Sequence, residues 1–509
     1  MIFSLAVHAA RMYRAVWVQQ VSCVNVRSGG FEFGVALAPG DAPMPPGAAA
    51  RPKTKLPIAN AKTSAIATRV ICPIRSPRVN IDPPISSHPV DPRPITPLRR
   101  ALEDARVRVP ASKSIANREL VLSAIGSGRS RIVVGEMDPG DDVHAMAEAL
   151  TALGHEVRWD AGHIDVTPLQ VPYAHASVDA RDAGTVARFI SALAALSDAE
   201  TRVDGSERMR GRPMAAIAAA LRSLGATVDG EALPFVIHGP LRGGEVSVPG
   251  YESSQFASAL LLVAPRMRGG LSLRISGELV SAPFIDMTAT ALEGRGVRVE
   301  RASMRHFVVA PQKVKARSVT IPGDLTAATY PAAAAAILGG SVTIENASAT
   351  HHVGGQGDAR FFDLIAEMGC EVSGGSRAIT VRRRGALSGV VANVADCSDV
   401  FPTLAVIATQ AATPTELDGL AHTRRQESDR LRAVAAAITA LGGRARAFAD
   451  GIRIEPAPLH DGVVDAQGDH RIAMAFSVLG LLVPGVAIAG WQSVAKTFPS
   501  FYEMLRSLR

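Results

Sequence analysis

The sequence is poor in cysteine and has no long apolar run, and both shortages exclude classes of protein. Its 509 residues include only four cysteines, with neither paired nor metal-type spacing, at Cys23, Cys72, Cys370 and Cys397. This pattern favours a reducing compartment over a disulfide framework and predicts no metal site. No apolar stretch is long and charge-free enough to span a membrane. We therefore expect a cytoplasmic globular protein that does not bind a membrane.

The chain also lacks a general excess of positive charge, although its formal net charge is +7. Residues 1–100 hold 13 Lys and Arg against 4 Asp and Glu, whereas the rest of the chain holds 41 basic and 43 acidic residues. The basic excess therefore lies in the N-terminal segment and not on a folded face, which argues against a nucleic-acid partner.

The N-terminal segment, residues 1–103, is rich in Pro, Ala and Ser and shows no sustained periodicity. It is predicted to be a disordered tail that folding does not require. Arg11 and Arg14 closely follow the apolar residues 1–7, which argues against a secretory signal. An organelle transit peptide and a dispensable extension both fit this composition, and both readings stay open.

From residue 105 onward, the sequence repeats with a period of about seventy residues. Glycines between helix-type and strand-type segments recur at intervals of 71, 71, 73 and 73 residues, at Gly154, Gly225, Gly296, Gly369 and Gly442. A glycine in this place ends a helix and releases the chain into a strand. A second series, of helix starts, keeps the same step, at Ser114, Gly184, Ser254, Leu325, Ser398 and His470. The chain thus contains six repeats, each with strands and two helices.

The repeats predict an α/β protein built of two similar halves. Grouping them three plus three places the break near Gly323 and Asp324, so that residues 112–323 form one half. Residues 104–111 and 324–509 form the other half. The sixth repeat lacks its final strands, and residues 105–111 are candidates to supply them.

Several helix starts carry small or polar residues without an evident packing role, as at Ser112 to Ser114 and Asp469 to His470. The free N–H groups and the dipole of a helix N-terminus attract anions. If the two halves face each other, these helix ends form a cleft suited to a ligand with several phosphates or carboxylates.

Short segments at these helix starts resemble the motifs of one family. They are Ser112-Lys113-Ser114 with Asn117-Arg118, Ala183-Gly184-Thr185 with Arg188, Arg212-Pro213, Ser253-Ser254-Gln255, Ser281-Ala282-Pro283, Glu427-Ser428-Asp429-Arg430, Asp469-His470-Arg471 and Lys496-Thr497-Phe498-Pro499. In order and spacing they resemble the enolpyruvyl transferases, and within them the EPSP synthase family, over roughly residues 105–509. The resemblance implies two similar domains, each of three βαβαββ units in an inside-out α/β barrel arrangement.

The resemblance also implies a reaction. EPSP synthases (3-phosphoshikimate 1-carboxyvinyltransferases) transfer the enolpyruvyl group of phosphoenolpyruvate to the 5-hydroxyl of shikimate 3-phosphate and release phosphate. This is a step of the shikimate pathway toward chorismate and the aromatic amino acids. The chemistry needs a base, an acid and cations, and it uses no metal or organic cofactor. We expect a monomer whose partners are these two small molecules.

Individual residues take expected roles from the same resemblance. Those expected to hold shikimate 3-phosphate are Lys113, Ser114, Arg118, Ser253, Ser254, Gln255, Ser281, Asp399 and Gln426. Those expected to hold phosphoenolpyruvate are Lys113, Gly184, Arg212, Gln255, Arg430, Arg471 and Lys496. Asp399 is expected to act as the base near the 5-hydroxyl, and Glu427 as the proton donor to the methylene carbon. Lys113 is expected to touch both substrates, and His470 to support the proton transfer or the phosphate.

Some of these positions also fit ordinary structural roles. Glu427 lies three residues before Arg430, like a surface ion pair, and Asp399 and His470 could merely cap helices. One departure from the family pattern is Phe284, where many relatives have Tyr. Another is Gln426, where relatives usually have Lys; Gln cannot supply charge to a phosphorylated substrate.

Three other functions share parts of this pattern. UDP-N-acetylglucosamine enolpyruvyl transferase would be expected to carry Asn after Lys113 and a loop cysteine, whereas no cysteine occurs between residues 112 and 323. RNA 3′-phosphate cyclase has a related repeat fold, but the near-neutral core and the missing nucleotide motif disagree with it. A paralogue with a different phosphorylated acceptor, or with weakened catalysis, is supported by Gln426.

Overall fold

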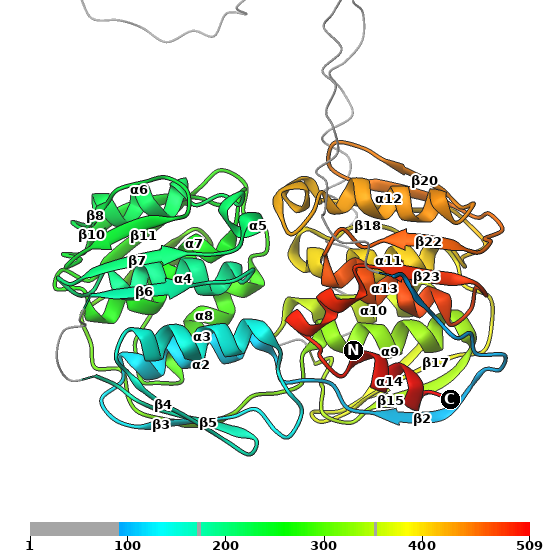
Figure 1. The fold of residues 1–509 in the computed structure, drawn as a ribbon, viewed down its shortest axis with the longest axis horizontal. Coiled ribbons are helices and arrows are strands. Elements are labelled where there is room, and N and C mark those ends of the chain that lie inside the picture. The colour runs from blue at the N-terminus through cyan, green and yellow to red at the C-terminus, as the bar shows by residue number, and fades with distance from the viewer. Residues whose placement is uncertain (1–90, 170–174, 351–353) are drawn as a thin grey trace, which may run out of the picture. The chain divides into compact units, whose positions relative to one another are not determined.

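The computed structural model describes residues 91–169, 175–350 and 354–509, which belong to one unit of the chain (Figure 1). Most of the predicted tail, residues 1–90, lies outside the described residues. Within the described ranges, no helix combines the length and the apolar character that a membrane crossing requires. Buried hydrophobic side chains form two clusters, one from residues 111–321 and one from residues 95–109 and 325–508. We call the first the inserted lobe and the second the split lobe.

The inserted lobe contains three four-stranded sheets, each belonging to one βαβαββ unit. The first unit comprises β14 (Ser318–Thr320), α2 (Lys113–Ala124), β3 (Ser130–Val133), α3 (Asp141–Ala152), β4 (Glu156–Asp160) and β5 (His163–Thr167). The second comprises β6 (Ala176–Asp179), α4 (Gly184–Ala194), β7 (Glu200–Asp204), α5 (Glu207–Arg210), α6 (Ala215–Ser223), β8 (Thr227–Val228) and β9 (Phe235–His238). The third comprises β10 (Gly244–Pro249), α7 (Ser254–Val263), η1 (Ala264–Arg266), β11 (Leu271–Ser276), α8 (Pro283–Glu293), β12 (Glu300–Ser303) and β13 (His306–Val309). In each unit the first two strands pair in parallel and the last two form an antiparallel hairpin.

The split lobe repeats this plan with one incomplete unit. The fourth unit comprises β2 (Leu102–Val107), α9 (Leu325–Leu338), β15 (Gly340–Ile344), η2 (Gly357–Ala359), α10 (Arg360–Glu367), β16 (Glu371–Gly374) and β17 (Ile379–Arg383). The fifth comprises β18 (Val391–Asn393), η3 (Ala395–Val400), α11 (Phe401–Ala408), β19 (Thr415–Asp418), η4 (Ala421–Arg425), α12 (Arg430–Ala440), β20 (Arg444–Ala447) and β21 (Ile452–Glu455). The sixth comprises β22 (Gly462–Asp465), α13 (His470–Gly480), β23 (Val486–Ala489), η5 (Trp491–Lys496) and α14 (Phe501–Ser507), and β1 (Arg93–Pro94) joins its sheet.

The two lobes are connected where the chain crosses between them twice. Strand β2 precedes the inserted lobe but pairs in parallel with β15 of the split lobe, and β14 pairs in parallel with β3. The two crossing segments lie side by side: Ser112 N–H donates to the Pro322 carbonyl, and Asp324 N–H donates to the Pro110 carbonyl, each at 2.8 Å. The prediction that residues 105–111 complete the sixth repeat is wrong, because β2 opens the fourth repeat and β1 pairs with β23 instead.

Residues 93–103 are part of the fold, although the predicted tail extended to residue 103. The Arg93 guanidinium lies 4.5 Å from the ring centre of Trp491 and 4.0 Å from that of Tyr502. Ile95 is buried in the split-lobe core. A two-residue strand that follows a Pro-rich segment carries no periodicity, so the sequence pattern gave no signal for this contact.

The first helix of each unit is buried, and the sheets lie outside these helices. All but one of the 14 residues of α9 are buried, as are all 11 residues of α13. Helix α9 reads LTAATYPAAAAAIL, and a helix without a polar face is stable only inside a core. Its small alanines allow neighbouring helices to approach closely. This arrangement confirms the predicted inside-out α/β architecture.

Candidate active site

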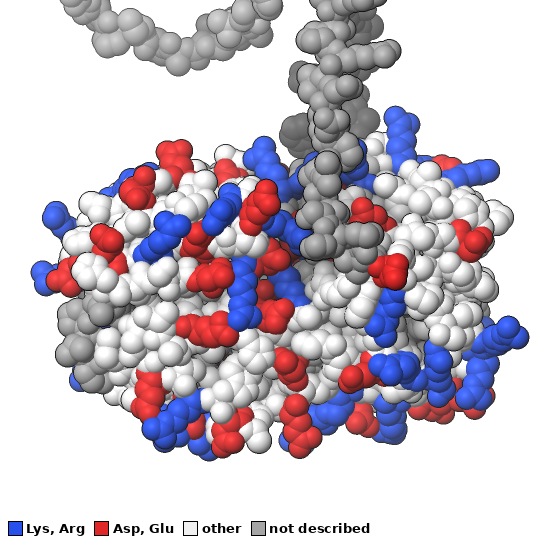
Figure 2. All heavy atoms as spheres, viewed as in Figure 1, with Lys and Arg blue, Asp and Glu red and all other residues white. Residues whose placement is uncertain are grey.

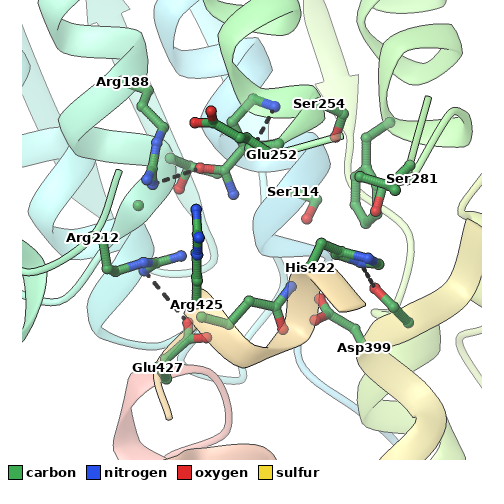
Figure 3. A pocket seen from close by; sticks show the side chains of 18 of the residues that line it. Ser114, Arg188, Arg212, Glu252, Ser254, Ser281, Asp399, His422, Arg425 and Glu427 are labelled. Atoms are coloured by element: carbon green, nitrogen blue, oxygen red, sulfur yellow. Dashed lines mark hydrogen bonds and ion pairs between the residues drawn. The ribbon is translucent and has the colours of Figure 1, made fainter. Parts of the chain in front are cut away.

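A polar cavity lies where helix N-termini of both lobes meet (Figure 3). The inserted lobe contributes the first residues of α2, α4 and α7, and the split lobe contributes those of α12 and α13 together with turn η3. Seven cationic and four carboxylate side chains line it, an excess of three positive charges. The predicted site residues that line the cavity are Lys113, Ser114, Arg118, Gly184, Arg212, Ser253, Ser254, Gln255, Ser281, Asp399, Gln426, Glu427, Arg430 and Arg471. The other two, Lys496 and His470, lie beside Glu427 and next to Asp469 respectively.

Glu427 is held by three cations that come from both lobes. Its carboxylate lies 2.7 Å from Lys496 Nζ and 2.7 Å from Arg430 Nη2 in the split lobe. Arg212 of the inserted lobe approaches the same carboxylate at 3.6 Å. Burial alone would raise the pKa of Glu427, but Lys496, Arg212 and Arg430 outweigh it and hold the pKa well below its usual value. Glu427 is therefore ionised here and must gain a proton before it can act as an acid.

Asp399 connects the two arginines at the starts of α12 and α13. Its carboxylate accepts from Arg430 Nη1 at 2.8 Å and from Arg471 Nη2 at 2.7 Å. Burial opposes ionisation of Asp399, but Arg471 and Arg430 together lower its pKa below the usual value. The ionised carboxylate faces the cavity, so it can accept a proton from a hydroxyl group placed there.

His470 does not line the cavity, although it starts α13. Its side chain is 1% exposed, and neither ring nitrogen has a hydrogen-bond partner among the described residues. Burial, followed by the charges of Lys496 and Arg471, holds the pKa of His470 well below its usual value. A neutral, buried imidazole in this position has no direct contact with a ligand in the cavity.

Lys113 is paired with a carboxylate that the sequence motifs did not identify. Its Nζ lies 2.6 Å from Asp142 Oδ2, and the two side chains are 15% and 4% exposed. Asp142 lies in the first turn of α3, where the helix dipole favours a negative charge. The charge of Lys113 also contributes to lowering the pKa of Asp399 in the other lobe. Lys113 is therefore near the site residues of the inserted lobe and also near Asp399 of the split lobe.

Two other arginines of the inserted lobe already donate to protein groups. Arg118 donates to Thr288, Ser258 and the carbonyls of Ser114 and Phe284, and its burial lowers its pKa to about 9. Arg188 donates to the Gln255 side-chain oxygen at 3.0 Å and to the Pro213 carbonyl at 2.8 Å. These bonds fix the cavity wall from behind.

Gly184 allows the guanidinium groups of Arg188 and Arg212 to pack closely together in the cavity wall. A Cβ atom at this position would lie 2.9 Å from Arg212 Nη2 and closer still to Arg188 Nη1. Only glycine therefore lets both guanidinium groups pack against the start of α4.

Serines complete the cavity opposite the arginines. Ser253 caps α7 by accepting from Gln255 N–H at 3.2 Å. Ser281 has φ of +55°, a left-handed conformation that costs a non-glycine residue on the order of 1 kcal/mol. Phe284 lies beside Ser281 in the lining and offers no hydroxyl group. The hydroxyl groups of Ser114, Ser254 and Ser281 point into the cavity in Figure 3 and are available to a ligand.

The lining also includes Asp142, His422 and Arg425, for which no role was predicted from the sequence. His422 lies 2.8 Å from the Ser398 hydroxyl. Asp142 lies outside the helix-start segments that carried the resemblance, so no pattern marked it. Arg425 directly precedes Gln426, the residue that stands where the family pattern has Lys.

The comparisons with known proteins agree with this geometry. The family model for EPSP synthase (3-phosphoshikimate 1-carboxyvinyltransferase) matches residues 99–505. A relative of that name from Methanosphaerula palustris is 37% identical over 412 residues, covering 79% of this chain and 96% of its own. A relative of the same name from a Nostoc species is 34% identical over 78% of this chain and 95% of its own.

Solved structures show the same fold. The EPSP synthase from Acinetobacter baumannii matches with a TM-score of 0.67 at 24% identity, over 81% of this chain and 97% of its own. The enolpyruvyl transferase NikO from Streptomyces tendae matches with a TM-score of 0.62 at 18% identity, over 82% and 98%. The fold is therefore that of the enolpyruvyl transferases. Within that class, the chain belongs to the EPSP synthase family.

Proposed function

We propose that this chain transfers the enolpyruvyl group of phosphoenolpyruvate to the 5-hydroxyl of shikimate 3-phosphate, giving 5-enolpyruvylshikimate 3-phosphate and phosphate. The observation that carries the proposal is the cavity with its excess of three positive charges, built from both lobes of an EPSP synthase family member. The two substrates together bear two phosphates and two carboxylates, which arginine, lysine and helix N-termini bind well.

Each lobe supplies part of the proposed anion site. Lys113 and Arg212 come from the inserted lobe, and Arg430, Arg471 and Lys496 from the split lobe. In the structure these cations are paired with protein carboxylates, mainly Glu427 and Asp399. Substrate anions would compete for the same cations. Partial release of Glu427 from its cations would raise its pKa and allow it to carry the proton for the methylene carbon.

The proposal assigns Asp399 the role of the base that accepts the proton of the 5-hydroxyl. It assigns His470 a supporting role, because the imidazole is buried behind the cavity next to Asp469. No metal or organic cofactor enters the proposal.

A coupled phosphate-release assay tests this function. With purified full-length protein, phosphate should appear only when both phosphoenolpyruvate and shikimate 3-phosphate are present, and mass spectrometry should find the enolpyruvyl ether product. Reactions that lack either substrate, and a reaction with UDP-N-acetylglucosamine as acceptor, are the controls. Absence of phosphate release with both substrates would refute the proposal.

A paralogue with a different phosphorylated acceptor is the second candidate. It is favoured by Gln426, whose side-chain oxygen accepts from Arg430, and by Phe284 in the cavity wall. This candidate predicts that the protein binds phosphoenolpyruvate in the presence of its true acceptor but turns over shikimate 3-phosphate very slowly. The same assay, run with other phosphorylated cyclic alcohols, separates the two candidates.

The proposal also includes a cytoplasmic monomer that binds neither nucleic acid nor membrane. Cys370 and Cys397 are buried free thiols, as a reducing compartment favours. On the face seen in Figure 2, basic and acidic side chains are interspersed. Light scattering of the purified protein should give the mass of a single chain.

A further inference from the structure

Arg425, the last residue of η4 (Ala421–Arg425), lines the cavity but has no role in the proposed mechanism. Its side chain is exposed and lines the cavity. It also lines a second hollow that shares Arg212, Pro213 and Gln426 with the cavity. Figure 3 shows Arg425 reaching from the split lobe toward Arg188 and Arg212 of the inserted lobe. Arg425 thus stands at the junction between the cavity and its outer hollow.

Arg425 differs from the other cations of the cavity in having no partner. Lys113, Arg212, Arg430 and Arg471 are paired with carboxylates, and Arg118 and Arg188 donate to carbonyl, amide or hydroxyl oxygens. Within residues 91–169, 175–350 and 354–509, the Arg425 guanidinium makes neither a hydrogen bond nor an ion pair with another side chain or with the backbone. All five of its donors are therefore available to a ligand.

An unpaired guanidinium that reaches toward two other arginines is electrostatically unfavourable until an anion enters. The neighbouring residue does not relieve this repulsion, because Gln426 is neutral and its oxygen accepts from Arg430. Gln426 is also the position where the family pattern predicts a lysine. The positive charge that is missing at residue 426 is therefore present one residue earlier, on the longer side chain of Arg425.

We propose that Arg425 is a substrate-binding residue that supplies, from position 425, the charge that a lysine at 426 would supply. This inference rests on the proposed function and deepens it. Guanidinium binds phosphate and carboxylate groups through paired hydrogen bonds, and both substrates carry both groups. The shared chemistry is thus an oxyanion at the cavity mouth, and separate measurements with each substrate identify its source.

The first experiment compares Arg425→Gln with Arg432→Gln in the full-length protein. Arg432 is the matched control, because it is an exposed arginine seven residues further along that lines neither the cavity nor the outer hollow. We measure KM for each substrate, and the affinity for shikimate 3-phosphate alone by calorimetry. Arg425→Gln should raise KM about tenfold for the substrate whose oxyanion it contacts, as expected for the loss of one charge-assisted hydrogen bond. Arg432→Gln should change neither KM, and equal constants in the two variants would overturn the inference.

The second experiment asks whether positions 425 and 426 supply one shared charge. Gln426→Lys should restore most of the lost affinity in the Arg425→Gln background, and should give a smaller gain in the wild-type background. An equal effect of Gln426→Lys in both backgrounds would overturn the idea of a relocated charge. Absence of turnover in the wild-type protein would instead refute the proposed function. Unaltered substrate affinity in Arg425→Gln, with an active wild type, would refute only this inference.

Discussion

Replacement of Lys113 by methionine tests the proposed site most directly, because Lys113 is expected to contact both substrates. Each lost charge-assisted contact costs about 1.5–3 kcal/mol, so two contacts amount to about 3–6 kcal/mol. The expected fall in kcat/KM is thus about 10²- to 10⁴-fold. Steady-state phosphate release with both substrates varied measures it.

The same substitution also removes the partner of Asp142, whose side chain is 4% exposed. Orphaning a fully buried carboxylate costs about 3–5 kcal/mol, but the first turn of α3 partly offsets this, so we expect about 2–3 kcal/mol of lost stability. Urea unfolding should show this loss in Lys113→Met. The double variant Lys113→Met with Asp142→Asn should recover the stability, because the remaining group is neutral.

The double variant separates binding from folding. If Lys113 acts on the substrates, activity should stay low in the double variant although its stability is restored. Recovery of activity together with stability would show that Lys113 only holds Asp142 in place. A fall of less than tenfold in the single variant would refute the assignment of Lys113 to both substrates.

Three further results are expected. Burial, with the nearby Asp399 charge, raises the pKa of Asp358 to about 7, so its stabilising contribution is complete below about pH 4 and is lost as the pH rises through 7. Melting temperatures of Asp358→Asn and wild type should therefore diverge in favour of the variant between pH 4 and 8, and parallel curves would contradict this. A protein that starts at residue 91 should have the melting temperature of the full chain. One that starts at residue 98 should melt several degrees lower, because it loses Arg93 and strand β1. Equal melting temperatures of the two truncated proteins would contradict the packing role of β1. Arg295→Met should cost about 3–5 kcal/mol in urea unfolding, because it leaves the buried Glu119 carboxylate without its 2.8 Å partner, and a loss below 1 kcal/mol would contradict this.

Much of the architecture was predictable because the repeat is strongly periodic. The glycines at intervals of 71 to 73 residues end helices at fixed places, so the six units can be counted in the sequence alone. The sheet that β2 joins was not predictable from the same pattern. Strand β2 has six residues and β14 has three, and sequence periodicity does not say which neighbouring sheet each one joins.

Site residues at helix starts were predictable because the N-terminus of a buried helix points in a fixed direction. Fourteen of the sixteen predicted site residues line the cavity. Asp142 was not found, because it acts through its spatial partner Lys113 and leaves no periodic trace in the sequence. Arg425 was not found, because it lies just before the Glu427 motif and not within it. The role of Asp142 follows from its ion pair with Lys113. The role proposed for Arg425 follows from the lack of a partner among the described residues. The functions of individual residues stay predictions until the variants are measured.

The early strands β1 and β2 pair with strands that lie much later in the sequence. This order determines when each part of the protein can fold during synthesis. The inserted lobe is one continuous segment, so its core is complete once residue 323 has left the ribosome. The split lobe needs β1 and β2, which are made first, to pair with β23 and β15, which are made much later. Residues 108–344 must be made between the end of β2 and the end of β15, which takes roughly 10–50 s at about 5–20 residues per second. During that interval β2 has no partner strand, and a nascent chain of this kind depends on the early folding of the inserted lobe or on a chaperone to keep that strand from pairing with another molecule.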